Sequence, residues 1–167
     1  MDFAKAFDKV PYQRLLKKIR AHGIDGRLYN WISSWLQNRR QRVVLNGSFS
    51  TWMEVFSGVP QGSVLGPLLF IIFINDIDEG IAIDILRKFA DDTKGGQIVT
   101  KIEDQQKLQE SLNSLFSWSQ KWEMEFNVNK CKILHVGKNN PNYDYYMNSQ
   151  KLQSTESEKD IGVHIDS

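Results

Sequence analysis

Apolar residues recur at helical spacing in the first part of the chain. The segment 11–22 opens on Pro11, which suits a first helical turn, and Gly23 after it provides a C-terminal stop. Its apolar stripe consists of Leu15, Leu16 and Ile19. The segment 26–37 predicts a second helix by the same periodicity. Its apolar face carries Leu28, Trp31, Ile32 and Trp35.

The middle of the chain alternates β-prone runs with punctuating turns. Asn46-Gly47 separates runs at 42–45 and 50–56, and this dipeptide between such runs is a strong signal of a hairpin. Two more strands are predicted at 81–90 and 93–99. The acidic pair Asp91-Asp92 then falls at or near the turn between them. A further strand is predicted at 131–136.

Two more helices are predicted in the rest of the chain. The loop 58–63 is rich in Gly and Pro, and Ser63 can cap an apolar helix that covers roughly 65–75. The segment 103–122 gives the clearest helical pattern, and its early acidic residues favour the positive end of the helix dipole. Its apolar positions are Leu108, Leu112, Leu115, Phe116 and Trp122.

Helices and strands mix without strict β-α-β alternation, which favours an α+β fold with an antiparallel sheet backed by helices. The 167 residues have the size of one domain, and 41% hydrophobic with 25% charged residues is ordinary for a globular protein. The longest apolar run, 64–74, is shorter than the 18 to 20 residues a bilayer requires and is interpreted as buried core. We therefore expect one domain, 1–167, and no membrane partner.

Charge and cysteine content indicate the cellular compartment and the kind of partner to expect. The single cysteine, Cys131, excludes an internal disulfide and, with no export signal, favours an intracellular location, nuclear or cytoplasmic. Cys131 is either a nucleophile or, as we prefer, a small buried residue. The net charge of +1 does not indicate a polyanionic partner. The basic clusters at 17–20 and 39–42 are either solvated faces or phosphate contacts.

Asp91 and Asp92 are the first candidates for chemistry. Two adjacent carboxylates at the end of an apolar strand repel each other unless a cation lies beside them. The alternative is a solvated turn, since Asp is common in turns. The segment 2–8, DFAKAFD, offers further carboxylates, and phosphoryl transfer by two metal ions needs carboxylates that converge from separate segments. Taken alone, Asp2 could also be a disordered terminal residue.

These segments resemble the polymerase motifs of reverse transcriptases from non-LTR retrotransposons. The resemblance covers the chain from Asp2 to its end and keeps the order and spacing of the motifs. The matching segments are 2–8 (DFAKAFD, motif A), 58–67 (GVPQGSVLGP, motif B), 89–93 (FADDT, motif C), 127–132 (NVNKCK, motif D) and 158–163 (EKDIGV, motif E). The stretches 21–23, 73–76 and 134–137 resemble the CR1 clade of LINE elements.

The resemblance implies an RNA-directed DNA polymerase that uses an RNA template, a DNA primer and deoxynucleoside triphosphates. Asp2 and Asp91 would hold two Mg²⁺ ions, for which Mn²⁺ could substitute, and Asp92 would complete the acidic cluster. Phe7 would exclude a ribose 2′-hydroxyl or simply pack in the core. Gln61 and Gly62 would lie beside the nucleotide, and Gly58 would let the loop approach it. Lys130 would lie near the triphosphate or would merely be solvated. Ile161 and Gly162 would lie at the primer end.

Two departures from the family affect what the isolated chain is expected to do. Met1 directly precedes Asp2, where family members have a fingers region, and the chain stops at Ser167, where a thumb should follow. We therefore expect a truncated palm fragment in which Asp2 is frayed and primer extension is absent. The alternative is a catalytically inactive remnant that binds nucleic acid or a protein.

Overall fold

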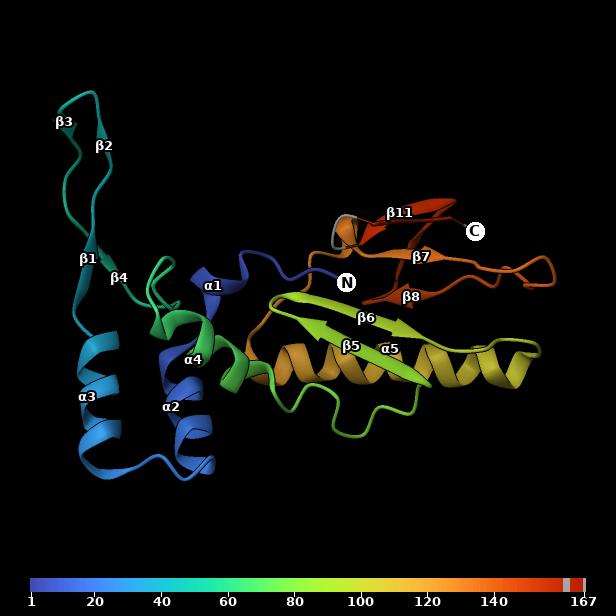
Figure 1. The fold of residues 1–167 in the computed structure, drawn as a ribbon, viewed down its shortest axis with the longest axis horizontal. Coiled ribbons are helices and arrows are strands. Elements are labelled where there is room, and N and C mark those ends of the chain that lie inside the picture. The colour runs from blue at the N-terminus through green and yellow to red at the C-terminus, as the bar shows by residue number, and fades with distance from the viewer. Residues whose placement is uncertain (161–162, 167) are drawn as a thin grey trace. The chain divides into compact units, whose positions relative to one another are not determined.

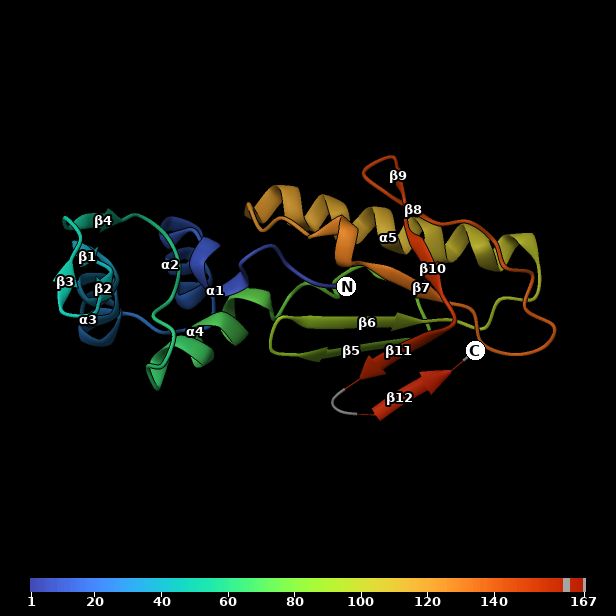
Figure 2. The ribbon, with the colours of Figure 1, turned by 90° about the horizontal axis from the view of Figure 1, so that it is seen from above.

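The computed structural model describes residues 1–160 and 163–166, and its contacts divide the chain into two compact units. One unit joins Met1–Ala4 to Ile77–Ser167, and the other is Lys5–Asp76. Figures 1 and 2 show the elements of each unit from two directions. Each unit is described by itself.

Helices form the core of the Lys5–Asp76 unit. They are α1 (Ala6–Lys9), α2 (Tyr12–Ala21), α3 (Gly26–Leu36) and α4 (Leu65–Ile74). Helix α2 packs against both α3 and α4. The predictions at 11–22, 26–37 and 65–75 are confirmed to within a residue at each end. The predicted apolar stripe of α2 is buried, but of the predicted apolar face of α3 Ile32 is buried while Leu28 and Trp31 are exposed. The buried apolar residues of these helices include Leu15, Leu16, Ile19, Ile32, Leu36, Leu69, Phe70 and Phe73.

The hairpin around Asn46-Gly47 is confirmed. Strand β2 (Val44–Leu45) pairs with β3 (Ser48–Phe49), and both turn residues have positive φ, 48° and 79°, as a type I′ turn requires. Farther from the turn, β1 (Arg39–Gln41) pairs with β4 (Met53–Val55). The first strand thus starts at Arg39, earlier than expected, where Arg39 pairs with Val55. The Arg39 guanidinium also donates hydrogen bonds to the Tyr12 hydroxyl and to the carbonyl of Ser57.

The basic segment 17–20 is not a uniformly solvated face. Lys18 is 4% exposed, and its ammonium group donates to the Asp76 carboxylate and to the Phe73 carbonyl. The same nitrogen lies 4.8 Å from the centroid of the Phe73 ring. A buried ammonium is tolerated only when it is paired and hydrogen-bonded, and Asp76 and the end of α4 meet that need.

The other unit combines a long helix with short strands. Strands β5 (Ile85–Phe89) and β6 (Asp92–Gly96) form an antiparallel hairpin, and α5 (Ile102–Trp122) runs along it (Figure 2). The predicted strands at 81–90 and 93–99 are thus shorter than expected. The helix is confirmed, and the Asp104 carboxylate accepts the backbone N–H groups of Thr100 and Lys101 at its start.

The C-terminal part of this unit is built from short strands. After the 3₁₀ turn η1 (Val128–Lys130) come β7 (Lys132–Leu134), β8 (Tyr146–Met147), β9 (Gln150–Lys151), β10 (Gln153–Thr155), β11 (Ser157–Asp160) and β12 (Val163–Asp166). Strand β7 is the predicted strand at 131–136, shortened. The pairs β8–β9 and β11–β12 are antiparallel, whereas β7 and β10 are parallel.

The architecture is a mixture of helices and small, mostly antiparallel sheets, in agreement with the expected α+β class. Within the parts of the chain that the structure describes, no helix has the length and apolarity needed to cross a membrane.

The Lys18–Asp76 pair generates a stability prediction. Asp76→Ala leaves a buried ammonium without its carboxylate. We expect the free energy of unfolding to fall by about 3 kcal/mol. This is the lower end of the range for a broken buried pair, because the Asp76 side chain keeps 27% exposure. Lys18→Met, which removes the charge and keeps the apolar stem, should cost far less. Urea unfolding measures both variants, and equal losses would contradict the account.

Candidate active site

The segment Met1–Ala4 is paired through its backbone on both sides. On one side the Met1 amine donates to the Thr93 carbonyl at 2.8 Å, and the Thr93 N–H donates back to the Met1 carbonyl at 3.1 Å. On the other side the Asn127 N–H donates to the Asp2 carbonyl and the Ala4 N–H to the Glu125 carbonyl, both at 2.8 Å. The expectation that Asp2 is frayed is therefore wrong, because the backbone of its segment is hydrogen-bonded on both sides.

This pairing brings two predicted carboxylates together. Reciprocal hydrogen bonds between Met1 and Thr93 are those of an antiparallel pair, so the next residue, Asp2, faces the preceding residue of β6, Asp92. Side chains of directly opposed residues lie on the same face of a sheet. Asp2 and Asp92 accordingly line the same cavity.

Asp91 occupies the turn of the hairpin. Phe89 pairs with Asp92, so Ala90 and Asp91 are the two turn residues, and Ala90 adopts a left-handed φ of 52°. Asp91 is half-buried and is not among the described residues that line the cavity with Asp2 and Asp92. In the described ranges, 1–160 and 163–166, no three acidic, His or Cys side chains are grouped so as to hold a metal ion. The structure thus joins Asp2 to Asp92 and leaves Asp91 one residue away, in the turn.

Lys130 provides a cation beside the Asp2 carboxylate. Its Nζ lies 3.2 Å from Oδ2 of Asp2, and its side chain is 67% exposed while that of Asp2 is 25% exposed. The hydrogen bond from Asn127 to Asp2 places η1, and with it Lys130, beside the acidic strand. Such an exposed pair contributes at most about 1 kcal/mol. Lys130 is therefore not merely solvated, and its ammonium can exchange partners at low cost.

Cys131 is a buried residue, as the sequence favoured. It has no solvent exposure, and its Sγ lies 4.0 Å from the Asp2 carbonyl oxygen. Burial raises the pKa of the Cys131 thiol, with only partial compensation from that carbonyl contact. The thiolate, which is the nucleophilic form, is thus disfavoured at neutral pH.

The residues expected near the nucleotide belong to the Lys5–Asp76 unit. The Phe7 ring stacks on Phe70 with a centroid distance of 4.7 Å, so its packing role is present. Gln61 and Gly62 are exposed, in the loop before α4. Ser63 accepts the Gly66 N–H at 2.9 Å, which is the expected capping contact at the start of that helix. Ile161 and Gly162 lie outside the described residues.

Gly58 has a role that sequence reasoning missed. Its φ is +85°, and an added Cβ would lie 2.6 to 2.7 Å from backbone atoms of Phe7 and Asp8. The Gly58 N–H donates to the Val10 carbonyl at 2.8 Å, and the Val59 N–H donates to the Phe7 carbonyl at 2.7 Å. Motif B therefore begins by packing against motif A, and Gly58 permits that contact. A glycine at position 58 indicated a close backbone contact, but the sequence did not show that the contact is with Phe7 and Asp8.

Comparisons with known proteins identify the family of the chain. A family model described as reverse transcriptase (RNA-dependent DNA polymerase) matches residues 1–164. The chain belongs to this reverse transcriptase family.

The relatives come from mobile elements. The RNA-directed DNA polymerase from mobile element jockey of Drosophila funebris is 31% identical over 180 residues, which cover 99% of this chain and 19% of that protein. A probable RNA-directed DNA polymerase from transposon X-element of Drosophila melanogaster is 27% identical over 174 residues, which cover 99% of this chain and 19% of that protein. The chain spans about a fifth of the length of these curated relatives. The expected kinship with non-LTR retrotransposon reverse transcriptases is confirmed, and the CR1 assignment stays a prediction.

The glycines of motif B generate a matched pair of variants. Gly58 and Gly62 both have positive φ, so alanine at either position carries backbone strain of about 1–2 kcal/mol. A Cβ on Gly62 meets nothing within 4 Å, whereas one on Gly58 overlaps backbone. We expect Gly58→Ala to destabilise the protein by about 2 kcal/mol more than Gly62→Ala, as overpacking does. Thermal or urea unfolding compares them, and equal effects would refute the contact between motifs.

Proposed function

We propose that this chain is the palm of an RNA-directed DNA polymerase that adds deoxynucleotides to a primer 3′-hydroxyl along an RNA template. The observation that carries the proposal is the pairing of the Asp2 strand with β6, which sets Asp2 opposite Asp92. Membership of the reverse transcriptase family supports the same reaction. The backbone pairing of Met1–Ala4 with Thr93 on one side and with residues 125–127 on the other supports the assignment as a palm.

Asp2, Asp91 and Asp92 are the proposed metal ligands. Mg²⁺ is usually held by one or two carboxylates together with substrate phosphates and waters, and two carboxylates facing each other suit that donor set. Asp91, from the adjacent turn, would add the third carboxylate. When bound, two such ions lower the pKa of the primer hydroxyl and offset the charge of the departing pyrophosphate.

The remaining roles concern how the chain binds its substrates. Phe7, held by its stack on Phe70, would lie under the sugar and leave no room for a 2′-hydroxyl. Gln61 and Gly62 would contact the nucleotide, since both are exposed in the loop before α4. Lys130 would leave Asp2 and donate to the pyrophosphate once a metal ion compensates that carboxylate. Ile161 and Gly162 would support the primer end.

A segment exchange tests the activity. Residues 1–164 replace the matched segment of the Drosophila funebris jockey polymerase, and RNA-templated primer extension is measured with Mg²⁺. We expect extension that falls roughly 10²–10³-fold in Asp91→Asn, as when a charge-stabilising group is lost from an active site. Asp144→Asn, which removes a half-exposed carboxylate paired with Lys151, is the matched control and should retain activity.

Two results would contradict the proposed polymerase. The first is a soluble exchange protein that binds the primer–template duplex but does not extend it, which would favour the inactive remnant. The second is extension that survives Asp91→Asn unchanged, which would move the chemistry away from motif C.

A further inference from the structure

The β-hairpin formed by β1 to β4 projects from the helices of its unit (Figure 1). Every residue from 40 to 54 is exposed, so the rest of the described chain leaves this part of the hairpin open to solvent. Its exposed large apolar side chains are Val43, Val44, Leu45, Phe49, Trp52 and Met53. Exposed apolar side chains gathered on one element mark interaction sites in folded proteins. The hairpin is therefore a candidate binding surface.

An arginine lies over two of the exposed rings. The guanidinium carbon of Arg42 is 4.1 Å from the centroid of the Phe49 ring and 4.6 Å from that of the Trp52 ring. Such cation–π contacts hold the three side chains together. Phe49 and Trp52 still keep 60% and 56% of their surface exposed, so both rings can accept a planar ligand. A guanidinium that stacks by its face also keeps its in-plane N–H donors for an anion.

The hairpin carries more positive charge than the chain as a whole. Residues 39–55 contain three arginines and one acidic residue, Glu54, which gives a formal charge of +2 against +1 for the whole chain. The Arg39 guanidinium is hydrogen-bonded within its own unit. Arg40 Nη2 lies 3.8 Å from Glu54 Oε1, but both side chains are more than half exposed, so this ion pair is weak. Arg40 and Arg42 are thus the cations that a partner would meet.

Exposed rings beside arginines favour a single nucleic-acid strand as the partner. Bases stack on aromatic side chains with little regard to sequence, and neighbouring positive charges follow the phosphate backbone. A single strand offers an open base face and a phosphate in every nucleotide, whereas the bases of a duplex are already stacked on one another. A second copy of the chain would bring two hairpins of charge +2 together, which like-charge repulsion disfavours.

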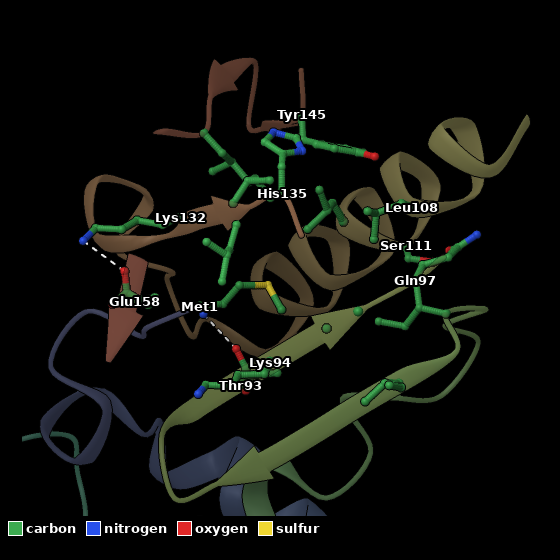
Figure 3. Close-up of a pocket in the computed structure, with 18 of the residues that line it drawn as sticks. Met1, Thr93, Lys94, Gln97, Leu108, Ser111, Lys132, His135, Tyr145 and Glu158 are labelled. Atoms are coloured by element: carbon green, nitrogen blue, oxygen red, sulfur yellow. Dashed lines mark hydrogen bonds and ion pairs between the residues drawn. The ribbon is translucent and has the colours of Figure 1, made fainter. Parts of the chain in front are cut away.

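We propose that the hairpin 39–55 binds single-stranded RNA, with bases stacked on Phe49 and Trp52 and phosphates held by Arg40 and Arg42. The choice of RNA over DNA rests on the proposed function, in which the template is RNA, whereas the rings and charges point to a nucleic-acid strand without it. The hairpin and α2 belong to one unit, and the cavity that the candidate carboxylates line (Figure 3) belongs to the other. The RNA contact is therefore additional to the acidic site.

Fluorescence anisotropy of a labelled oligouridylate of about 12 nucleotides, within the span of known single-strand sites, measures the binding. The 167-residue chain is titrated at low salt in EDTA, so no metal ion lies at the carboxylates. We expect saturable binding that Trp52→Ala weakens roughly tenfold, because one stacked base is lost. Trp31→Ala removes an equally exposed ring, 56%, from α3. It is the matched control and should bind as the wild type does, and equal losses in the two variants would overturn the proposal.

The salt dependence of the same titration tests the phosphate contacts. The logarithm of the affinity for a single strand falls with the logarithm of the salt concentration, with a slope of about −0.7 for each neutralised phosphate. Arg42→Gln should therefore make the slope shallower by about 0.7. Arg27→Gln, at an exposed arginine of α3, is the matched control and should leave the slope unchanged. An unchanged slope in Arg42→Gln would contradict the role of this arginine.

Four further results would overturn the proposal. They are failure of the wild type to bind the oligouridylate, equally tight binding of its duplex with oligoadenylate, tighter binding of the matching oligodeoxyuridylate, and a dimer of the chain that Trp52→Ala dissociates. The last would show that a second copy covers the rings. Because the assay contains no metal ion and measures no extension, its failure leaves the polymerase proposal standing, and loss of extension in the segment exchange leaves this binding result intact.

Discussion

The two-sided backbone pairing of Met1–Ala4 is the interaction on which the candidate site depends. Thr93 bonds this segment on one side, and the stretch from Glu125 to Asn127 bonds it on the other. Phe3 reinforces the second contact, because its ring stacks on Phe126 at 4.5 Å. Segments more than 90 positions apart in the sequence are thereby held side by side. Without this pairing, Asp2 and Asp92 would belong to unconnected segments, and no joint carboxylate site would exist.

The same pairing places the groups around the carboxylates. Because Asn127 is bonded to Asp2, the turn that follows brings Lys130 to the Asp2 carboxylate and buries Cys131 behind the strand. On the β6 side, Thr93 is held by Met1 through its backbone while its hydroxyl faces the cavity lining without a partner. The Met1–Ala4 segment therefore carries Asp2 and also lines the cavity.

Local features of the fold could be predicted from the sequence. Helical stripes, the Asn46-Gly47 turn and the α5 helix follow from periodicity and turn chemistry, which act over a few residues. The long-range contacts could not be predicted in that way. The residues near Lys18 in the sequence do not indicate that it is buried against Asp76, and those near Gly58 do not indicate that it packs on the backbone of Asp8.

The candidate site could be predicted only in part, because it too depends on long-range contacts. The motifs identified Asp2, Asp91 and Asp92, but the register that sets Asp2 opposite Asp92 and leaves Asp91 in the turn depends on hydrogen bonds between distant strands. Lys130 was expected near a triphosphate, and its contact with Asp2 follows from the bond that Asn127 makes. Pairing across 90 residues carries no periodic signal in a single sequence.

A titration with Mn²⁺ tests the central claim, that Asp2 and Asp92 form one site through strand pairing. The paramagnetic ion broadens nearby amide signals, and the chain is compared with its Asp2→Asn variant. If the account is right, the amides of Phe3 and Thr93 broaden together at the lowest Mn²⁺ concentrations, and Asp2→Asn suppresses the broadening of both. Broadening of Thr93 that persists unchanged in Asp2→Asn would contradict it, because the two carboxylates would then bind metal independently.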